Sequence, residues 1–299
     1  MKKKTKVKRR LGDRRDGRWV REMPGLQVIM AQLLPKRTER EVYLHETIDC
    51  TNVLKFLEKK NEGREKAERM TLFHCVVTGM ARMVNERPVM NRFIQGRRIY
   101  ERNEITLAFT CKRRFTDHAE ESLMIYTAKD DDTVNSISKE IIGEVREMRK
   151  SEKSTGGIDK VVDSFAKIPR LILIPVVGFI RFLDFWGKCP KAITEGDPNY
   201  ASVFLSNLGS IKCPSVYHHL NNYGTNSMMI TIGTIHKEEL LMEDGTKEIR
   251  DVVDIGATLD EAIGDGFYFA RSLKLIKHIF ANPDLLERPL SEPSGFDYK

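Results

Sequence analysis

The sequence predicts an α/β fold, because segments of helical and of strand pattern are interleaved along its 299 residues. Apolar residues recur at helical spacing over residues 71–85, whereas apolar and polar residues alternate, as in a strand pair, over residues 98–115. The interleaving has no regular βα period and includes no glycine-rich phosphate motif, so nucleotide-binding α/β folds are poor matches. With 40% apolar residues, the chain can bury one sizeable core or two small ones.

The same patterns place the individual elements in chain order. Pro88 stops the helix of residues 71–85, and the three aspartates at 130–132 precede another helix, where carboxylates cap a helix far more often than they bind metal. The strand pair of residues 98–115 is expected to turn at residues 101–103. The predicted helices are 51–60, 71–85, 134–150 and 265–280, and the further predicted strands are 122–128, 201–205, 227–235 and 248–259.

The positive charge is concentrated at the start of the chain. Residues 1–18 carry a net charge of +8, from ten Lys and Arg residues and from Asp13 and Asp16, whereas the whole chain carries +7. Because the rest is almost neutral, no nucleic-acid-binding surface is expected on the folded part. We predict a basic, flexible N-terminal arm over residues 1–24, which is either a solvated segment or a site for RNA, anionic lipid or the phosphates of a cofactor.

Five cysteines are scattered along the chain without any CxxC spacing. An odd number of isolated cysteines favours reduced thiols in a cytoplasmic protein over a disulfide framework or a zinc site. No metal site is therefore expected.

Residues 168–187 form an unusually apolar segment. Its longest uncharged run, residues 171–180, is too short to cross a bilayer, and a helical arrangement gathers Arg170, Arg181, Asp184 and Lys188 on one narrow face. The periodicity favours a helix packed into a core or against another subunit. A lid over an apolar substrate and peripheral contact with a membrane are the alternatives.

Four short motifs in a fixed order connect the sequence to a known family. They are residues 87–93 (RPVMNRF), 204–209 (FLSNLG), 228–235 (MMITIGTI) and 259–266 (LDEAIGDG). Together they resemble the catalytic domain of the dihydrolipoyl acyltransferases of 2-oxoacid dehydrogenase complexes, which belong to the chloramphenicol acetyltransferase-like superfamily. The last motif departs from the family pattern D-H-R-x-x-D-G, because Glu261 stands where the family has its catalytic histidine.

This resemblance implies a chloramphenicol acetyltransferase-like two-layer sandwich, with a mixed β-sheet and flanking helices, over residues 25–285, and a tail over residues 286–299. It also implies transfer of an acyl group between coenzyme A and another thiol, and homotrimers, or multiples of trimers, with each active site between two subunits. The substitution at Glu261 leaves a second hypothesis open, in which the protein is an inactive relative that binds acyl-CoA or acts as an assembly scaffold.

The resemblance also assigns roles to individual residues. Ser206 would donate a hydrogen bond to the oxyanion of the tetrahedral intermediate, and Asp265 would orient the site through an arginine. Glu261 would be the base, or else His219, in the loop between the second and third motifs, would be. Residues expected beside the coenzyme A or acyl-CoA are Asn207, Gly266, Arg14, Arg15 and Arg18.

Glutamate is a weaker base for a thiol than histidine. A thiol with a pKa near 8.5 gives its proton to histidine about 2 pKa units uphill, but to an ordinary glutamate about 4 units uphill. The difference of about 3 kcal/mol is a hundredfold or more in rate. Glu261 can therefore replace histidine only where burial raises its pKa.

Overall fold

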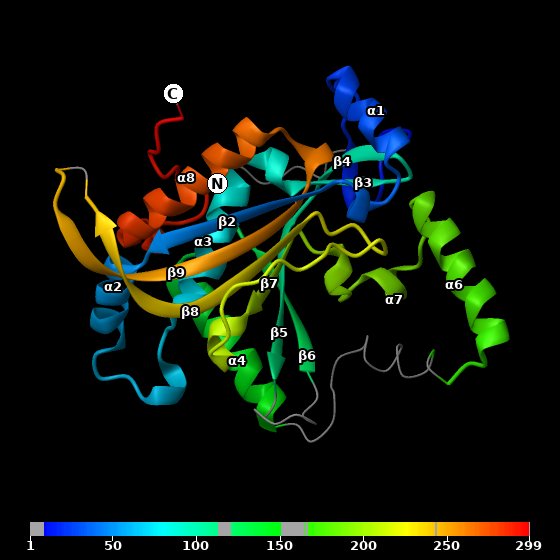
Figure 1. Cartoon of the computed structure of the whole chain (residues 1–299). Helices are drawn as coiled ribbons and strands as arrows, with labels where there is room; N and C mark the ends of the chain where they lie inside the picture. The colour runs from blue at the N-terminus through cyan, green and yellow to red at the C-terminus, as the bar shows by residue number, and fades with distance from the viewer. Residues whose placement is uncertain (1–8, 113–120, 151–164, 166, 243, 299) are drawn as a thin grey trace.

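A six-stranded mixed sheet forms the centre of the computed structural model, which describes residues 9–112, 121–150, 165, 167–242 and 244–298 (Figure 1). Strands β5, β7 and β8 run parallel to one another, and the remaining neighbours are antiparallel. The strand order is β2-β9-β8-β7-β5-β6. Their bounds are β2 Glu41–Asp49, β5 Ile105–Lys112, β6 Glu121–Ala128, β7 Val203–Asn207, β8 Met228–Leu241 and β9 Lys247–Asp260.

Four helices cover one face of this sheet and complete the two layers that the sequence predicts. The central one, α3 (Leu72–Glu86), packs against α4, α8, β5 and β7, and almost all of its side chains are buried. The core lies between these helices and the inward side chains of β5, β7, β8 and β9. The other three helices are α2 (Thr51–Asn61), α4 (Val134–Lys150) and α8 (Gly266–Ala281).

A second sheet of three strands lies beside the first. It consists of β1 (Gly17–Trp19), β4 (Arg98–Arg102) and β3 (Arg92–Gln95), in the order β1-β4-β3. The prediction that residues 98–115 form one hairpin is therefore wrong, because β4 and β5 belong to different sheets. The chain changes sheets after Arg102, whose buried guanidinium donates to the carbonyls of Tyr200 and Thr225 instead of lying at an exposed turn.

The segment that precedes residue 25 is not a free arm where the structure describes it. Strand β1 pairs with β4, and Arg14 is buried and ion-paired with Asp16 and with Asp184. A Cβ on Gly17 would lie 2.7 Å from the ring of Phe93, so this strand packs closely on the body. The prediction of a flexible arm is wrong for these residues, because complementary carboxylates bind its arginine, and residues 1–8 lie outside the described residues.

The C-terminal residues also belong to the folded domain. Leu286 and Leu290 are buried in the core, and Ser294 donates to the carboxylate of Glu86 on α3. A separate tail beginning at residue 286 is therefore not observed, since the boundary suggested by the proline content falls inside a packed segment.

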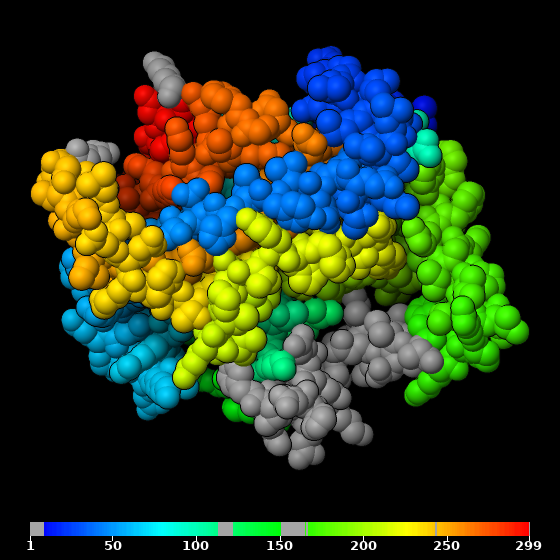
Figure 2. Space-filling model, viewed as in Figure 1, coloured from blue at the N-terminus to red at the C-terminus, as the bar shows by residue number. Residues whose placement is uncertain are grey.

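Helix α6 (Arg170–Phe185) confirms the predicted helix but not its burial in a core. Its C-terminal end is anchored by Asp184, whereas its outward side chains, such as Leu171 at 88% exposure, are open to solvent. Figure 2 shows it as a projection at the right edge of the molecule. The shorter helices α1 (Gly25–Leu33) and α7 (Lys191–Thr194) lie in the same half of the molecule (Figure 1). No helix in the described part of the chain is long and apolar enough to cross a membrane.

Candidate active site

Ser206 lies near the end of β7, on the sheet face that the helices leave uncovered. Successive side chains of a strand point to opposite faces, and Leu205 is buried in the core against α3. Ser206 therefore shares the opposite face with its neighbour Thr231 on β8. Sterics explain the glycine at the end of this motif, because a Cβ on Gly209 would lie 2.4 Å from the carbonyl oxygen of Gly233.

The second part of the candidate site lies at the end of β9 and consists of Asp260, Arg40 and Glu261. Both carboxylate oxygens of Asp260 accept hydrogen bonds of 2.8 Å from the guanidinium of Arg40, and the two side chains are 0% and 1% exposed. The backbone N–H of Glu261 donates to the carbonyl of Arg40 at 2.9 Å. This buried pair fixes where the Glu261 backbone lies, while the Glu261 side chain itself is exposed. The burial that would make Glu261 a stronger base is therefore absent from the isolated chain.

Asp265 has a different role from the one that the resemblance implies. Its carboxylate accepts a hydrogen bond from the backbone N–H of Tyr268 at 2.7 Å and caps the N-terminus of α8. Within the described chain, no arginine forms an ion pair with it, so the prediction that Asp265 acts through an arginine is wrong. Asp260 is the aspartate that holds the arginine. Gly266 begins the helix, and a Cβ added there would meet no atom within 4 Å.

His219 lies at the Glu261 end of the sheet. The loop that carries it crosses β8 at Thr231, and the backbone N–H of Leu220 donates to the carboxylate of Glu41 at 2.5 Å. Glu41 on β2 stands opposite Asp260 on β9. His219 is exposed, and its ring contacts the ring of His218 at 4.8 Å. Both candidate bases therefore lie at the same end of the sheet.

Ser206, the candidate oxyanion donor, and Glu261, one of the candidate bases, do not meet within one chain. Ser206 stands opposite Thr231, and Thr231 stands opposite Gly256 on β9. From Gly256 to the end of β9 is about 13 Å along the strand, and two strand spacings add about 10 Å across the sheet. Ser206 and Glu261 are thus roughly 16 Å apart in the backbone, which is far beyond hydrogen-bond reach.

The sequence resembles one curated protein, the lipoamide acyltransferase component of the branched-chain alpha-keto acid dehydrogenase complex of Bacillus subtilis. The two are 21% identical over 241 residues, which make up 79% of this chain and 46% of the relative. The chain therefore spans about half the length of the relative. No family model matches the sequence.

Solved structures of acyltransferases superpose on most of the chain. A probable dihydrolipoamide acetyltransferase from Listeria monocytogenes has a TM-score of 0.58 at 15% identity, covering 94% of this chain and 99% of that one. The dihydrolipoamide acetyltransferase of Azotobacter vinelandii has a TM-score of 0.58 at 14% identity, covering 90% and 94%. A chloramphenicol acetyltransferase has a TM-score of 0.50 at 12% identity, covering 88% and 99%.

The chain has the chloramphenicol acetyltransferase-like fold. The fold predicted from the four motifs is confirmed, and so is the resemblance to dihydrolipoamide acetyltransferase catalytic cores. The Azotobacter work concerns the role of a serine, a histidine and an asparagine in catalysis.

A cavity beside Ser206 contains residues that the motif comparison did not identify. It has a volume of about 600 Å³, lies between α3, α4 and the ends of β5 and β7, and includes Ser206 and Asn207 in its lining. Among the described residues, the lining contains four cations and no carboxylate, although Arg146 forms an ion pair of 3.2 Å with Glu68 outside it. Apolar side chains line much of the remainder. The cations are Lys112, Arg146, Arg149 and Lys150, and the apolar side chains include Phe73, Phe109, Ile141, Ile142, Val145, Leu208 and Ile211.

Three of these cations, at positions 146, 149 and 150, follow helical spacing in the last turns of α4. That spacing is the sequence signal that could have identified these cations, although by itself it is typical of any solvated helix face. His74 also lines the cavity, and burial lowers the pKa of its imidazole to about 4. His74 is therefore neutral at physiological pH and a weak base.

The three N-terminal arginines do not form a phosphate site together. Arg14 is occupied by Asp16 and Asp184, and Arg15 donates to the backbone carbonyl of Cys189. Arg18 is exposed on β1. The prediction that Arg14 binds cofactor phosphates is wrong, because two carboxylates already satisfy its guanidinium. In the described part of the chain, no three His, Cys, Asp or Glu side chains are grouped so as to hold a metal ion.

Proposed function

We propose that this protein is a coenzyme A-dependent acyltransferase whose active site forms between two copies of the chain. Ser206 of one copy would supply the oxyanion hydrogen bond, and the Glu261 end of a neighbouring copy would supply the base. The observation that carries the proposal is the position of Ser206 near the end of β7, in the lining of a cavity whose described residues include four cations and no carboxylate. The fold of acetyltransferase cores supports it.

The chemistry requires a thiol to lose its proton before it attacks a thioester. Glu261 would take that proton, and the thiolate would attack the acyl carbon to form a new C–S bond. The C–S bond to the donor would then break, and the donor sulfur would leave as a thiol with the proton returned by Glu261. Contact with a second copy would bury Glu261, which is exposed in one chain, and would raise its pKa toward that of a useful base. Oligomerisation therefore supplies the environment that the isolated chain lacks. A homotrimer satisfies this arrangement with three equivalent sites.

The cavity beside Ser206 has a cationic part and an apolar part, which match the two chemical parts of an acyl-CoA. The cations at the end of α4 would attract the phosphates, and the apolar walls would hold the pantetheine arm or the acyl chain. The basic residues predicted for the cofactor are thus replaced by Arg146, Arg149 and Lys150, and Asn207 keeps its proposed place. Arg15, Arg18 and Gly266 stay as proposed cofactor contacts of lower priority, because none of them lines this cavity, and His219 stays as the alternative base.

One observation favours the second function, a non-catalytic acyl-CoA binder or scaffold. The Asp260–Arg40 pair is buried, but Glu261, at the position of the family's catalytic histidine, is exposed. This protein would bind coenzyme A as tightly as an enzyme but would not transfer acyl groups. We propose a cytoplasmic location for either function, since all five cysteines are free thiols.

Binding of acetyl-CoA to the full chain tests the shared part of the two functions. Isothermal titration should detect binding, and a ligand that binds only the native state should raise the melting temperature. Transfer of the acetyl group to dihydrolipoamide, followed by release of free coenzyme A thiol, then separates the enzyme from the binder. Absence of binding at millimolar acetyl-CoA would contradict both functions.

A further inference from the structure

Helix α6 exposes apolar side chains on the side that faces away from the body of the molecule. Leu171, Ile174 and Phe182 share that side at helical spacing, and they are 88%, 60% and 58% exposed. Figure 2 shows the helix projecting at the right edge of the molecule. Further exposed apolar side chains on this helix and in the turn after it are Ile172, Phe179 and Trp186. A continuous apolar surface of this size marks an interaction site rather than an ordinary solvated helix.

All exposed charges of α6 and of the turns beside it are positive. Within residues 167–188 the one carboxylate is Asp184, which is 2% exposed and accepts hydrogen bonds from Arg14 at 3.0 Å and from Gln95 at 2.6 Å. The four cations of this segment form no ion pair with any described residue, and they are Lys167, Arg170, Arg181 and Lys188. A contact between two copies through this face would bring like charges together, whereas an anionic lipid surface complements both the cations and the apolar side chains.

A cavity at the C-terminal end of α6 offers a place for a lipid phosphate. It has a volume of about 320 Å³ and lies between α6, the turn that joins β3 to β4, and residues 222–224. Gly96 and Arg97 form this tight turn, with φ angles of 58° and 59°. A Cβ on Gly96 would collide with the carbonyl oxygen of Phe185, so the turn packs directly on α6. This contact places Arg97 and Arg181 in the lining of the same cavity.

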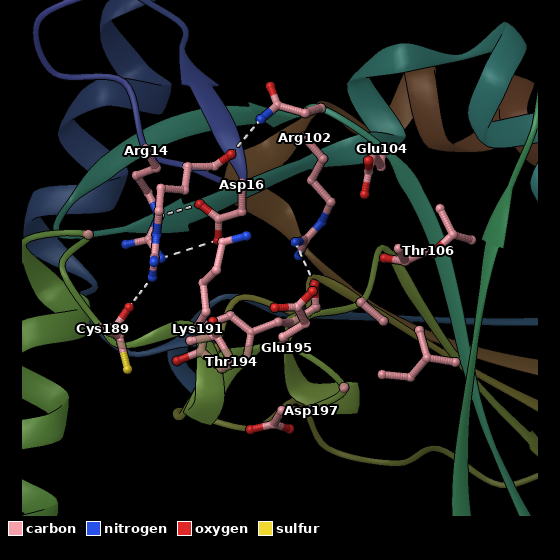
Figure 3. A pocket seen from close by; sticks show the side chains of 18 residues that line it. Arg14, Asp16, Arg102, Glu104, Thr106, Cys189, Lys191, Thr194, Glu195 and Asp197 are labelled. Carbon is pink, nitrogen blue, oxygen red and sulfur yellow. Dashed lines mark hydrogen bonds and ion pairs between the residues drawn. The ribbon is translucent and has the colours of Figure 1, made fainter. Parts of the chain in front are cut away.

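Positive charge exceeds negative charge at this cavity. The lining holds five cations and one carboxylate, and the ion pairs of these residues add one cation and three carboxylates, so six cations face four carboxylates. The lining cations are Lys36, Arg37, Arg40, Arg97 and Arg181, the lining carboxylate is Asp184, and the added residues are Glu39, Asp260 and the Arg14–Asp16 pair of Figure 3. Arg97 and Arg181 are exposed, and neither side chain has a hydrogen-bond or ion-pair partner among the described residues. Both guanidinium groups are therefore free to bind a phosphate, whose oxygens accept their parallel N–H donors.

We propose that α6 docks onto an anionic phospholipid membrane. Leu171, Ile174 and Phe182 enter the interface between headgroups and acyl chains, while Arg97 and Arg181 bind the phosphate of one headgroup in the cavity. Arg181 follows Ile174 by seven residues and lies on the same side of the helix, so both contacts form with one membrane surface. The helix lies on the membrane and does not cross it. This docking is separate from the proposed acyl transfer and does not depend on it.

Sedimentation of the full chain with phospholipid vesicles tests the apolar contact. The protein should bind vesicles of phosphatidylcholine that contain about 30% phosphatidylglycerol, and it should bind pure phosphatidylcholine at least about tenfold more weakly. The double variant Leu171→Gln, Phe182→Gln should bind the anionic vesicles at least about tenfold more weakly, because two exposed apolar side chains are lost. The matched control is Leu241→Gln with Ile249→Gln, which are 73% and 71% exposed in the β8–β9 hairpin at the opposite edge of the molecule (Figure 1). It should leave binding within about twofold.

A second pair of variants tests the phosphate contact. Arg97→Gln with Arg181→Gln should weaken binding to the anionic vesicles at least about tenfold, since each cation at the surface of an anionic membrane contributes about fivefold. Lys59→Gln with Lys274→Gln removes the same charge from exposed positions on α2 and α8, and it should leave binding within about twofold. No binding of the wild-type chain to anionic vesicles would overturn the proposal, as would equal weakening by a variant and its control. A change of oligomeric state in Leu171→Gln, Phe182→Gln, measured by light scattering without lipid, would assign the face to a second copy of the chain and would also overturn it.

Discussion

The two ends of the central sheet differ in how they hold the residues of the proposed site. At the β9 end, the buried Asp260–Arg40 pair and the Asp265 cap hold the backbone on either side of Glu261, whose side chain is exposed. At the β7 end, Ser206 contributes to the lining of a cavity that also contains cations from α4. We therefore distinguish a structural part of the motif, the Asp260–Arg40 pair and the Asp265 cap, from a chemical part, the proposed reactive residues Ser206 and Glu261.

The largest expected effect concerns the structural part at the β9 end. Asp260→Ala leaves the Arg40 guanidinium buried without a counter-ion and should lower the free energy of unfolding by about 3–5 kcal/mol. Urea denaturation measures it. Asp265→Ala is the matched control, since it removes only a helix cap and should cost about 1 kcal/mol. Equal losses would mean that the two aspartates do not differ in the way that the structure indicates.

The chemical part at the β7 end predicts an effect on turnover instead. Ser206→Ala removes the proposed oxyanion donor and should reduce kcat for acetyl transfer by about 10²–10³-fold, with little change in stability. Steady-state kinetics with acetyl-CoA and dihydrolipoamide measure it. His219→Ala should leave kcat unchanged if Glu261 is the base, and a large loss in that variant would transfer the role to His219.

His74 makes the helix side of the Ser206 end sensitive to acid. Its pKa is lowered from 6.5 to about 4 in the folded chain, so the unfolded chain takes up a proton first as the pH falls. Stability from this group is complete above pH 6.5 and should decrease by up to about 3 kcal/mol as the pH falls from 6.5 to 4. His74→Asn, which can still accept the hydrogen bond from the Thr71 backbone, should remove this part of the pH dependence of urea denaturation.

A smaller effect is expected at the rim of the cavity. Arg149→Gln should weaken acetyl-CoA binding about tenfold in isothermal titration, because one charge-assisted contact with a phosphate is lost. Lys139→Gln changes the charge of the same helix equally but lies outside the cavity lining, and it should have almost no effect. Equal weakening by both variants would show that net charge alone attracts the ligand.

Much of the helix layer was predictable from the sequence because its pattern is local. The apolar spacing of residues 71–85 determines a buried helix, α3, whatever the rest of the chain does. The small sheet was not predictable, since β1 and β3 are short and both pair with β4, which alternation alone joins to β5. Likewise, the ten basic residues near the N-terminus predicted an arm, because Asp184, the partner of Arg14, lies 170 positions away.

The candidate site was likewise predictable only in part. Motif positions assigned roles to Ser206 and Glu261, but they could not show that these residues lie at separate positions along the sheet. That information resides in strand register, which depends on pairing between distant segments. For the same reason, the role of arginine partner was assigned to Asp265, although Asp260 holds Arg40.

Complementation between two inactive variants tests the central claim, that each active site takes Ser206 from one copy and Glu261 from another. Ser206→Ala and Glu261→Gln should each lose at least about 10²-fold in turnover, because each damages every site of its own assembly. Co-expressed in equal amounts and purified as mixed oligomers, they should recover about a quarter of the wild-type activity, since about a quarter of the shared sites then carry neither substitution. Mixed oligomers that stay as inactive as the separate variants would contradict the shared site.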